Sequence, residues 1–256
     1  MNNKLSNRLF LLGGHDLEMI TIKQLLEGRE DCVVVDKHLY WDTALLSAYQ
    51  KELSQYADYE IYGIELKEDI IAPDNYNSID HHNDKSGQPS SLEQVANLLG
   101  VTLNRYQQLV AANDKGYIPA MKALDASKEE IDEIRRKDRE EQGVTEEDDL
   151  LSEQSIKKFL KRYKSIYVVY SLTSKFSAIC DRLFPYQRLL IYTDSEWTFY
   201  GEGKASLVEE FGADIEMGRV YHGGGSMGYI GAVKGVFPPY KIKEFVTSIK
   251  QRYEHP

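Results

Sequence analysis

Two adjacent histidines stand in an acidic, polar segment of the chain, Asp80-His81-His82-Asn83-Asp84. Neutral imidazoles bind Mn²⁺, Fe²⁺, Co²⁺ and Zn²⁺, and neighbouring carboxylates can complete the set of ligands. A histidine pair in a polar turn is more often simply exposed to solvent. Here the pair directly follows a short strand-like stretch and is preceded by an aspartate, so the pattern favours a metal site.

Further carboxylates of the first half stand at expected loops or strand ends, and these are Asp16, Glu18, Asp36, Glu65 and Asp114. A pair of divalent ions needs several carboxylates to balance its charge. Two ions about 3.5–4 Å apart can activate water and hold both the entering and the leaving oxygen of a phosphoryl transfer. The residue types therefore indicate metal-dependent hydrolysis of a phosphoester or a phosphoanhydride.

The elements that must position these side chains alternate between strands and helices. We expect strands at 9–12, 32–35, 59–64 and 77–79, and helices at 20–26, from an N-cap at Asp42 to Leu53, and from a capping box at Ser90 and Glu93 to Gly100. Such alternation predicts an α/β fold with a parallel sheet. The candidate ligands then lie at the carboxyl ends of the strands, where open parallel sheets bind their ligands.

A charge-dense stretch separates this half from a second one. We predict an N-terminal domain at 1–126, a charged helical linker at 127–149 and a smaller C-terminal α/β domain at 150–256. The C-terminal domain is expected to contain strands at 166–170 and 189–192 and helices at 156–163 and 242–253.

Composition narrows the class of partner. The net charge of −10 argues against coating of long duplex nucleic acid, but not against a small anionic substrate near a cluster of cations or metals. No apolar run is long enough for a membrane helix, and the two cysteines cannot form a disulfide framework. We therefore expect a cytoplasmic protein with no membrane partner and with a reducing environment around its thiols.

A glycine-rich segment near the end of the second half carries the other candidate site, at His222, Gly223, Gly224, Gly225 and Ser226. Consecutive glycines let backbone N–H groups approach an anion closely. The plainer interpretation is a flexible hairpin tip. Tyr221 and Tyr229 flank the glycines and are candidates for stacking on a base.

Two of these segments together resemble a known family. Asp80-His81-His82-Asn83 resembles the signature of the DHH phosphoesterases, and the glycine-rich segment resembles the motif of that family's C-terminal, DHHA1-type domain. The resemblance implies an N-terminal parallel-sheet DHH-type domain, a smaller C-terminal α/β domain and two Mn²⁺ ions, with Mg²⁺, Co²⁺ or Fe²⁺ as alternatives. Members include single-strand nucleases, enzymes of very short oligonucleotides, cyclic-dinucleotide phosphodiesterases and manganese pyrophosphatases.

The resemblance also implies roles for individual residues. The metal ligands would be Asp16, Glu18, Glu65, Asp80, His81 and Asp114, the catalytic motif Asp80, His81 and His82, and the substrate-binding segment His222 to Ser226. This sequence departs from the family pattern where Glu18 and Glu65 stand in place of aspartates, and where Ser226-Met227 follows the glycines instead of another histidine. Because glutamate is longer by a methylene, the backbone must sit further back to keep the ligand distances.

The predicted function is hydrolysis of a short oligonucleotide, a cyclic dinucleotide or another nucleotide-derived phosphodiester. Two alternatives stay open at this point. One is an inorganic pyrophosphatase or polyphosphatase, and the other is a degenerate nucleotide-binding module without catalysis, motivated by the altered motifs. No organic cofactor is expected, and the oligomeric state is open, with a homodimer as one option.

Overall fold

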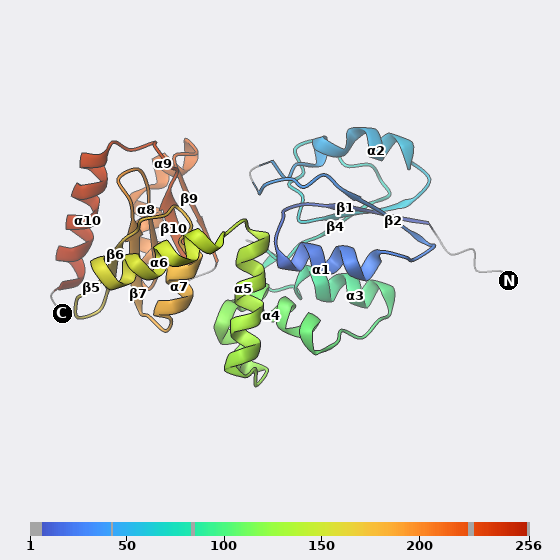
Figure 1. The fold of residues 1–256 in the computed structure, drawn as a ribbon. Helices are drawn as coiled ribbons and strands as arrows, with labels where there is room; N and C mark the ends of the chain where they lie inside the picture. The colour runs from blue at the N-terminus through green and yellow to red at the C-terminus, as the bar shows by residue number, and fades with distance from the viewer. Residues whose placement is uncertain (1–6, 42, 83–84, 225–227, 255–256) are drawn as a thin grey trace. The chain divides into compact units, whose positions relative to one another are not determined.

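The structure is a computed structural model that describes residues 7–41, 43–82, 85–224 and 228–254. The chain divides into two compact units, Met1–Gly143 and Val144–Pro256, which are described separately below (Figure 1). In the described part of the chain, no helix is both long and apolar enough to cross a membrane.

The first unit is built on a four-stranded sheet. Its strands are β1 (Arg8–Leu12), β2 (Cys32–Asp36), β3 (Glu60–Ile64) and β4 (Tyr76–Ile79), in the order β2-β1-β3-β4. Every neighbouring pair is parallel. The predicted parallel sheet is therefore confirmed, and the carboxyl ends of all its strands lie at one edge.

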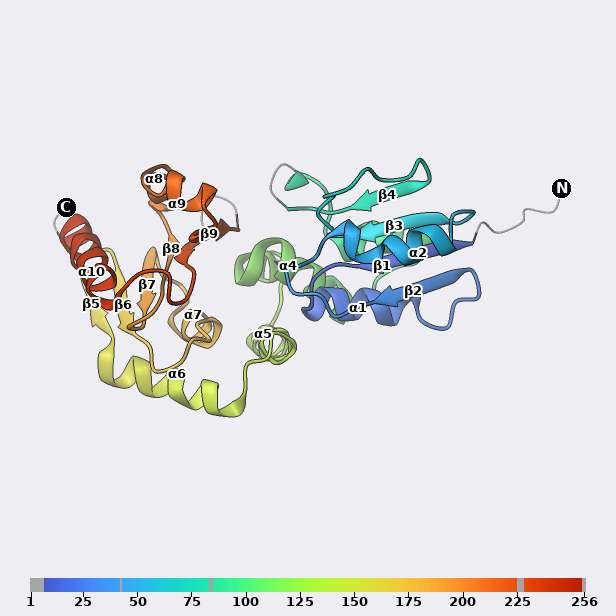
Figure 2. The same ribbon diagram turned by 90° about the horizontal axis from the view of Figure 1, so that it is seen from above.

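Helices cover both faces of this sheet (Figures 1 and 2). On one face lie α1 (Leu17–Leu26) and α3 (Ser91–Leu99); on the other lie the short 3₁₀ helix η1 (Leu46–Tyr49) and α2 (Gln50–Gln55). After Arg8, the inner strand β1 is apolar, and Leu9, Phe10, Leu11 and Leu12 are all fully buried. A strand buried on both faces has no reason to alternate, which is why its sequence reads as a continuous apolar run.

Helix α3 begins and ends as its sequence predicts. Ser90 and Glu93 form a reciprocal capping box, and the helix stops at Gly100 with φ of 65°. The expected N-cap at Asp42 lies outside the described residues. Two further helices complete the unit, α4 (Arg105–Ala123) and α5 (Lys128–Glu141).

The charged segment expected to form one linker helix consists of two helices. Helix α5 belongs to the first unit, where Ile131 and Ile134 are buried, and the chain turns at Gly143 with φ of 74°. Helix α6 (Glu146–Phe159) begins at a capping box formed by Thr145 and Asp148 and belongs to the second unit. The thin apolar stripe of α5 therefore packs against its own unit.

The second unit contains a six-stranded mixed sheet in the order β5-β6-β7-β8-β10-β9. Its strands are β5 (Lys161–Arg162), β6 (Tyr167–Tyr170), β7 (Arg188–Tyr192), β8 (Trp197–Gly201), β9 (Val220–Gly223) and β10 (Tyr229–Ala232). Among the described strands of this sheet, only β6 and β7 pair in parallel. The helix expected to run to residue 163 ends at Phe159, because Leu160 is extended and the next two residues pair with β6.

Both faces of this second sheet are covered. Alternate residues such as Val168, Leu190 and Phe199 pack with α10 (Pro239–Glu254) and α8 (Lys204–Glu210). The intervening residues Val169 and Leu189 pack with α7 (Ser177–Leu183), and a short helix α9 (Gly212–Glu216) follows α8. The α/β class predicted for both halves is confirmed.

The strand end beside the candidate site leaves no space for a side chain at Gly13. A Cβ built there would overlap the carbonyl oxygen of Ile64 and lie 2.6 Å from that of Glu65. We expect Gly13→Ala to lower the free energy of unfolding of the first unit by about 1–3 kcal/mol, because backbone must move. Differential scanning calorimetry measures this. Gly87→Ala, where the Cβ would meet nothing within 4 Å, is the control, and equal stability of both variants would contradict the packing described.

Candidate metal centre

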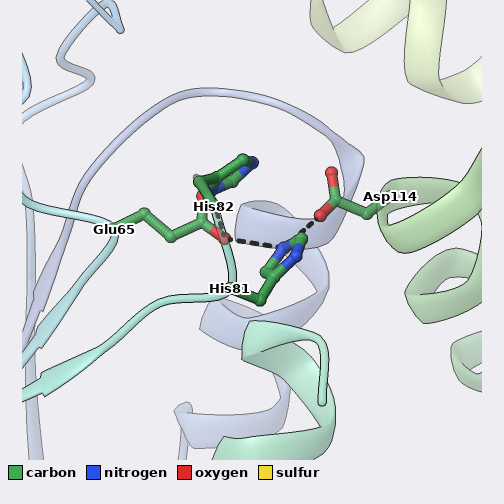
Figure 3. Close-up of side chains that lie close together, drawn as sticks. All are labelled: Glu65, His81, His82 and Asp114. Carbon is green, nitrogen blue, oxygen red and sulfur yellow. Dashed lines mark ion pairs between the residues drawn. The ribbon is translucent and has the colours of Figure 1, made fainter. Parts of the chain in front are cut away.

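Four side chains with metal-binding atoms converge beyond the carboxyl ends of β3 and β4. One nitrogen or oxygen from each of Glu65, His81, His82 and Asp114 lies within 4.8 Å of those from the others (Figure 3). Glu65 directly follows β3, and His81 is the second residue after β4, whereas Asp114 reaches the cluster from α4. The convergence results from the parallel sheet, which brings the ends of strands distant in sequence to one edge.

The imidazole of His81 is the centre of this cluster. Its Nε2 lies 2.5 Å from Asp114 Oδ2, 3.3 Å from Glu65 Oε1 and 3.5 Å from Glu18 Oε2. The His81 side chain is only 4% exposed, and those of Glu18 and Glu65 are 2% and 3% exposed. Three carboxylates thus face one ring nitrogen in a buried site.

The N-terminal end of α3 positions two of these carboxylates. Glu18 Oε1 accepts a hydrogen bond from the backbone N–H of Leu92 at 3.1 Å. Glu65 Oε1 accepts one from the hydroxyl of Ser91 at 2.7 Å. Backbone N–H groups in the first turn of a helix have no partner within the helix, and the helix dipole favours negative charge there. Helix α3 therefore holds both glutamates in place.

Asp16 lies in the same buried region but has a structural role in the described geometry. It is the N-cap of α1, and its Oδ1 accepts from the backbone N–H of Met19 at 2.9 Å. Burial raises the pKa of its carboxyl well above the usual value, and the charges of Asp114 and Glu65 raise it further. The cap leaves the second oxygen of Asp16 for another partner.

Asp80 faces His82. Its Oδ1 accepts from the backbone N–H of His82 at 2.9 Å and lies 3.1 Å from His82 Nδ1, while Lys85 Nζ lies 3.7 Å from Oδ2. The ring of His82 is 44% exposed, in contrast to the buried ring of His81. A carboxylate paired with one ring nitrogen fixes the orientation of an imidazole. The two histidines therefore differ in setting although they are adjacent.

The position of Asp114 depends on a break in α4 and on a buried arginine, neither of which the sequence pattern predicts. Helix α4 is broken just after it, at Gly116 and at Tyr117, whose φ is 57°. The preceding Asn113 is buried, and its side-chain oxygen accepts from Arg135 Nη1 at 2.9 Å. Arg135 of α5 also donates to Asp138 at 2.6 Å and lies over the ring of Tyr117. Arg135 stands in the charge-dense stretch, where the sequence pattern predicts side chains exposed to solvent, and yet it is buried.

The site contains more carboxylates than positively charged groups of the protein, since Glu18, Glu65 and Asp114 all face the one imidazole of His81. Burial raises the pKa of Glu18 well above its usual value, with the charge of Asp114 adding to the shift. Burial disfavours the charged imidazole of His81, yet its contacts with Asp114, Glu18 and Glu65 raise its pKa to about 12. The carboxylates thus favour a positive charge at the position that His81 Nε2 faces.

Three atoms of the site support a cation at that position. Among the described residues, Glu18 Oε2, His81 Nε2 and Asp114 Oδ2 are buried and have no hydrogen-bond partner. Buried polar atoms are rarely left without a partner, and one usual explanation is an ion. Carboxylate oxygens with an imidazole nitrogen suit Mn²⁺, Fe²⁺ or Zn²⁺, so the donor set fits a divalent metal.

Other predicted site residues lie elsewhere. Asp36, considered as an extra ligand, accepts a hydrogen bond from Lys23 Nζ at 3.0 Å. Of the predicted substrate-binding segment, His222 and Gly223 belong to β9 and Gly224 follows it, whereas Gly225 and Ser226 lie outside the described residues. These residues are in the second unit, so their relation to His81 stays a prediction.

The glycines of that segment have local packing reasons for their identity. Gly224 has φ of 70°, and a Cβ at Gly223 would lie 2.7 Å from the hydroxyl of Tyr229. The carbonyl oxygen of Gly223 accepts a hydrogen bond from Lys204 Nζ at 2.7 Å, and Lys204 is 8% exposed. Both Tyr221 and Tyr229 cover glycines of the neighbouring strand, which explains part of the aromatic content of this region.

The known proteins found to be similar to this chain are solved structures. No protein-family model matches the chain, and no curated protein matches it. Among solved structures, the DHH domain of a member of the s1p family of ribosomal proteins is similar over 97% of this chain and 87% of that one, with 10% identity and a TM-score of 0.54.

Two further solved structures are similar over most of this chain. The pGpG-specific phosphodiesterase PggH from Vibrio cholerae covers 98% of this chain and 100% of its own at 13% identity and a TM-score of 0.47. RecJ in complex with Mn²⁺ from Thermus thermophilus covers 97% and 52% at 10% identity and a TM-score of 0.45. The likeness to the first of the three structures, over nearly all of both chains, shows that this chain has the fold of DHH-domain proteins.

Proposed function

We propose that the chain is a divalent-metal-dependent phosphoesterase that hydrolyses a short nucleotide-derived phosphodiester. The observation that carries the proposal is the convergence of Glu18, Glu65 and Asp114 on the buried Nε2 of His81. The DHH-type fold adds support. The cluster around His81 lies at the carboxyl ends of the strands, where an open parallel sheet binds its ligand.

The metal ligands we propose are Glu18, Glu65, His81 and Asp114, with Asp16 and Asp80 as further candidates. When bound, a pair of divalent ions would supply an activated water and neutralise charge on the phosphoryl group. Mn²⁺ fits the mixture of imidazole and carboxylate donors, and Mg²⁺, Co²⁺ and Fe²⁺ are the alternatives.

We assign the exposed histidine a different role from the buried one. With its Nδ1 held by Asp80, the neutral ring of His82 keeps Nε2 as a proton acceptor. It can therefore hold a proton beside the phosphoryl oxygens, or complete the ligand set. Asp80 acts as the residue that orients this ring.

In the second unit, we propose that the glycine-rich segment from His222 to Ser226 binds the phosphate or sugar that does not react. The positive φ of Gly224 and the lack of side chains support this proposal, because they let the backbone approach an anion closely. The net charge of −10 also favours a short substrate over long duplex nucleic acid.

The unfolding temperature with and without Mn²⁺ can show whether the carboxylates around His81 bind a metal or only stabilise the fold. Glu18→Gln keeps an oxygen that can accept from Leu92 but removes one buried negative charge. We expect the metal-free variant to unfold at the same or a higher temperature than the wild type, because like charges repel less. The Mn²⁺-induced rise in its unfolding temperature should shrink by at least half. Thermal unfolding with and without EDTA measures both quantities.

The control for that measurement is Glu52→Gln, which removes a carboxylate paired with Lys37 on the other face of the sheet. It should leave the Mn²⁺-induced rise unchanged. A Glu18→Gln protein that responds to Mn²⁺ like the wild type would contradict the assignment of Glu18 as a ligand.

Turnover tests the function itself. We expect chelator-sensitive, Mn²⁺-dependent cleavage of at least one member of a panel of short oligonucleotides, cyclic dinucleotides, a chromogenic phosphodiester and pyrophosphate. His81→Ala should lower the rate by 100-fold or more, because it removes the nitrogen on which the carboxylates converge. Steady-state kinetics with purified protein measures the loss.

Each outcome of that substrate panel points to a different function of the chain. Cleavage of pyrophosphate alone would identify a phosphoanhydride hydrolase instead. Binding of nucleotides without any turnover in saturating Mn²⁺ would identify a binding module. Unchanged turnover in His81→Ala would contradict the proposed site.

A further inference from the structure

A large aromatic side chain lies exposed beside the candidate metal centre. Trp41 is 49% exposed, although tryptophan is usually among the most buried side chains, and the neighbouring Tyr40 is 77% exposed. The loop after β2 carries both. Tryptophan is enriched at interfaces, because its large apolar ring also carries a polar N–H group.

The indole nevertheless packs against two neighbours. It lies on the backbone of Gly14, where a built Cβ would come within 2.5 Å of indole Cε2, so only glycine at this position lets the ring approach. On another side, the ring meets the imidazole of His82 at 5.8 Å between centroids and 62° between planes. Trp41 is thus in contact with a residue of the metal centre itself.

Hydrogen bonds join Tyr40, the residue before Trp41, to Thr43. The Thr43 hydroxyl donates to the carbonyl oxygen of Tyr40 at 3.0 Å and accepts from the backbone N–H of Tyr40 at 3.1 Å. The backbone N–H of Thr43 also donates to that carbonyl at 2.8 Å. The chain beyond is attached to the residues after β3, where Leu46 N–H donates to the carbonyl of Lys67 at 2.9 Å. Hydrogen bonds thus link Tyr40, which precedes Trp41, to Thr43, and link Leu46 to the residues after β3.

An exposed aromatic ring beside the proposed phosphoryl-binding site suits one kind of ligand. A nucleotide joins an anionic phosphate to a flat aromatic base, and every base offers a π face that stacks on tryptophan. Inorganic pyrophosphate or polyphosphate has nothing that would use this ring. A ring at this position can distinguish between a nucleotide and an inorganic phosphoanhydride, whereas the metal ligands contact only the phosphate that both contain.

We propose that Trp41 is a specificity-determining residue that stacks on the nucleobase next to the phosphate held at the metal centre, which makes the substrate a nucleotide and not an inorganic phosphoanhydride. This inference rests on the proposed function, because it takes the phosphate-binding position from the metal ligands. Tyr40 serves as the matched comparison, since it is adjacent and more exposed, and its described hydrogen bonds run to Thr43 and not to the site.

The test compares the binding of GMP with that of ribose 5-phosphate in the presence of Mn²⁺. Both ligands carry the same phosphate and sugar, but only GMP carries a base. We expect the wild type to bind GMP about 5- to 100-fold more tightly, measured by isothermal titration calorimetry. Trp41→Ala should remove this difference, Trp41→Phe should retain most of it, and Tyr40→Ala should leave it unchanged.

Tryptophan fluorescence gives an independent readout. The chain has two tryptophans, and the other, Trp197, is only 1% exposed, so emission that a ligand quenches comes from Trp41. GMP should quench the wild type, ribose 5-phosphate should not, and Trp41→Phe should not respond.

Equal affinities for the two ligands, no binding of either, or an unchanged preference for GMP in Trp41→Ala would each overturn the inference. Failure of the proposed function is separate: it appears in the wild type as absent turnover and as absence of any Mn²⁺-induced rise in unfolding temperature. Trp41→Phe, which keeps an aromatic ring against Gly14, guards against loss of the fold as the reason for weaker binding.

Discussion

Burial of several carboxylates around one imidazole is the constraint on which the first unit depends. Glu18, Glu65 and Asp114 face His81 Nε2 at 2.5–3.5 Å, and the side chains of the two glutamates are almost fully buried. Like charges in a buried site destabilise a protein unless partners or a cation compensate. The fold supplies partial compensation through the N-terminal end of α3, which donates to both glutamates. The remaining unpartnered atoms are the ones that a divalent cation would satisfy.

The same helix explains how glutamate can stand where the related motifs have aspartate. Glu18 lies in the first turn of α1, and its longer side chain spans to Leu92 of α3 while its other oxygen faces His81. Glu65 has φ of 53°, a left-handed conformation that few non-glycine residues adopt, and its side chain meets both Ser91 and His81. Strain of this kind persists where the surrounding structure holds it, and it is common at functional sites.

Much of this arrangement could be predicted from residue types and spacing. The apolar runs that end in polar residues gave the parallel sheet of the first unit, and the sheet in turn explains why Glu65 and His81 meet. The capping residues of α3 were readable for the same reason, because a capping box is a local feature of the sequence.

Other features depend on packing between distant segments and leave only a weak trace in the sequence. The division of the charged stretch into α5 and α6 follows from which unit buries Ile131 and Ile134. The buried Arg135 that holds Asn113 lies in a run of charges that looks solvated. Trp41 beside His82 is likewise a tertiary contact, made possible by a glycine 27 positions earlier in the chain.

The central claim is that the atoms around His81 Nε2 form a divalent-metal site. A crystal grown with MnCl₂ and measured on both sides of the manganese absorption edge tests it most directly. We predict an anomalous peak about 2.0–2.3 Å from His81 Nε2 and in contact with carboxylate oxygens of Glu18, Glu65 or Asp114. An anomalous map with no peak there, and with the three carboxylates still facing the ring nitrogen as they do now, would contradict it.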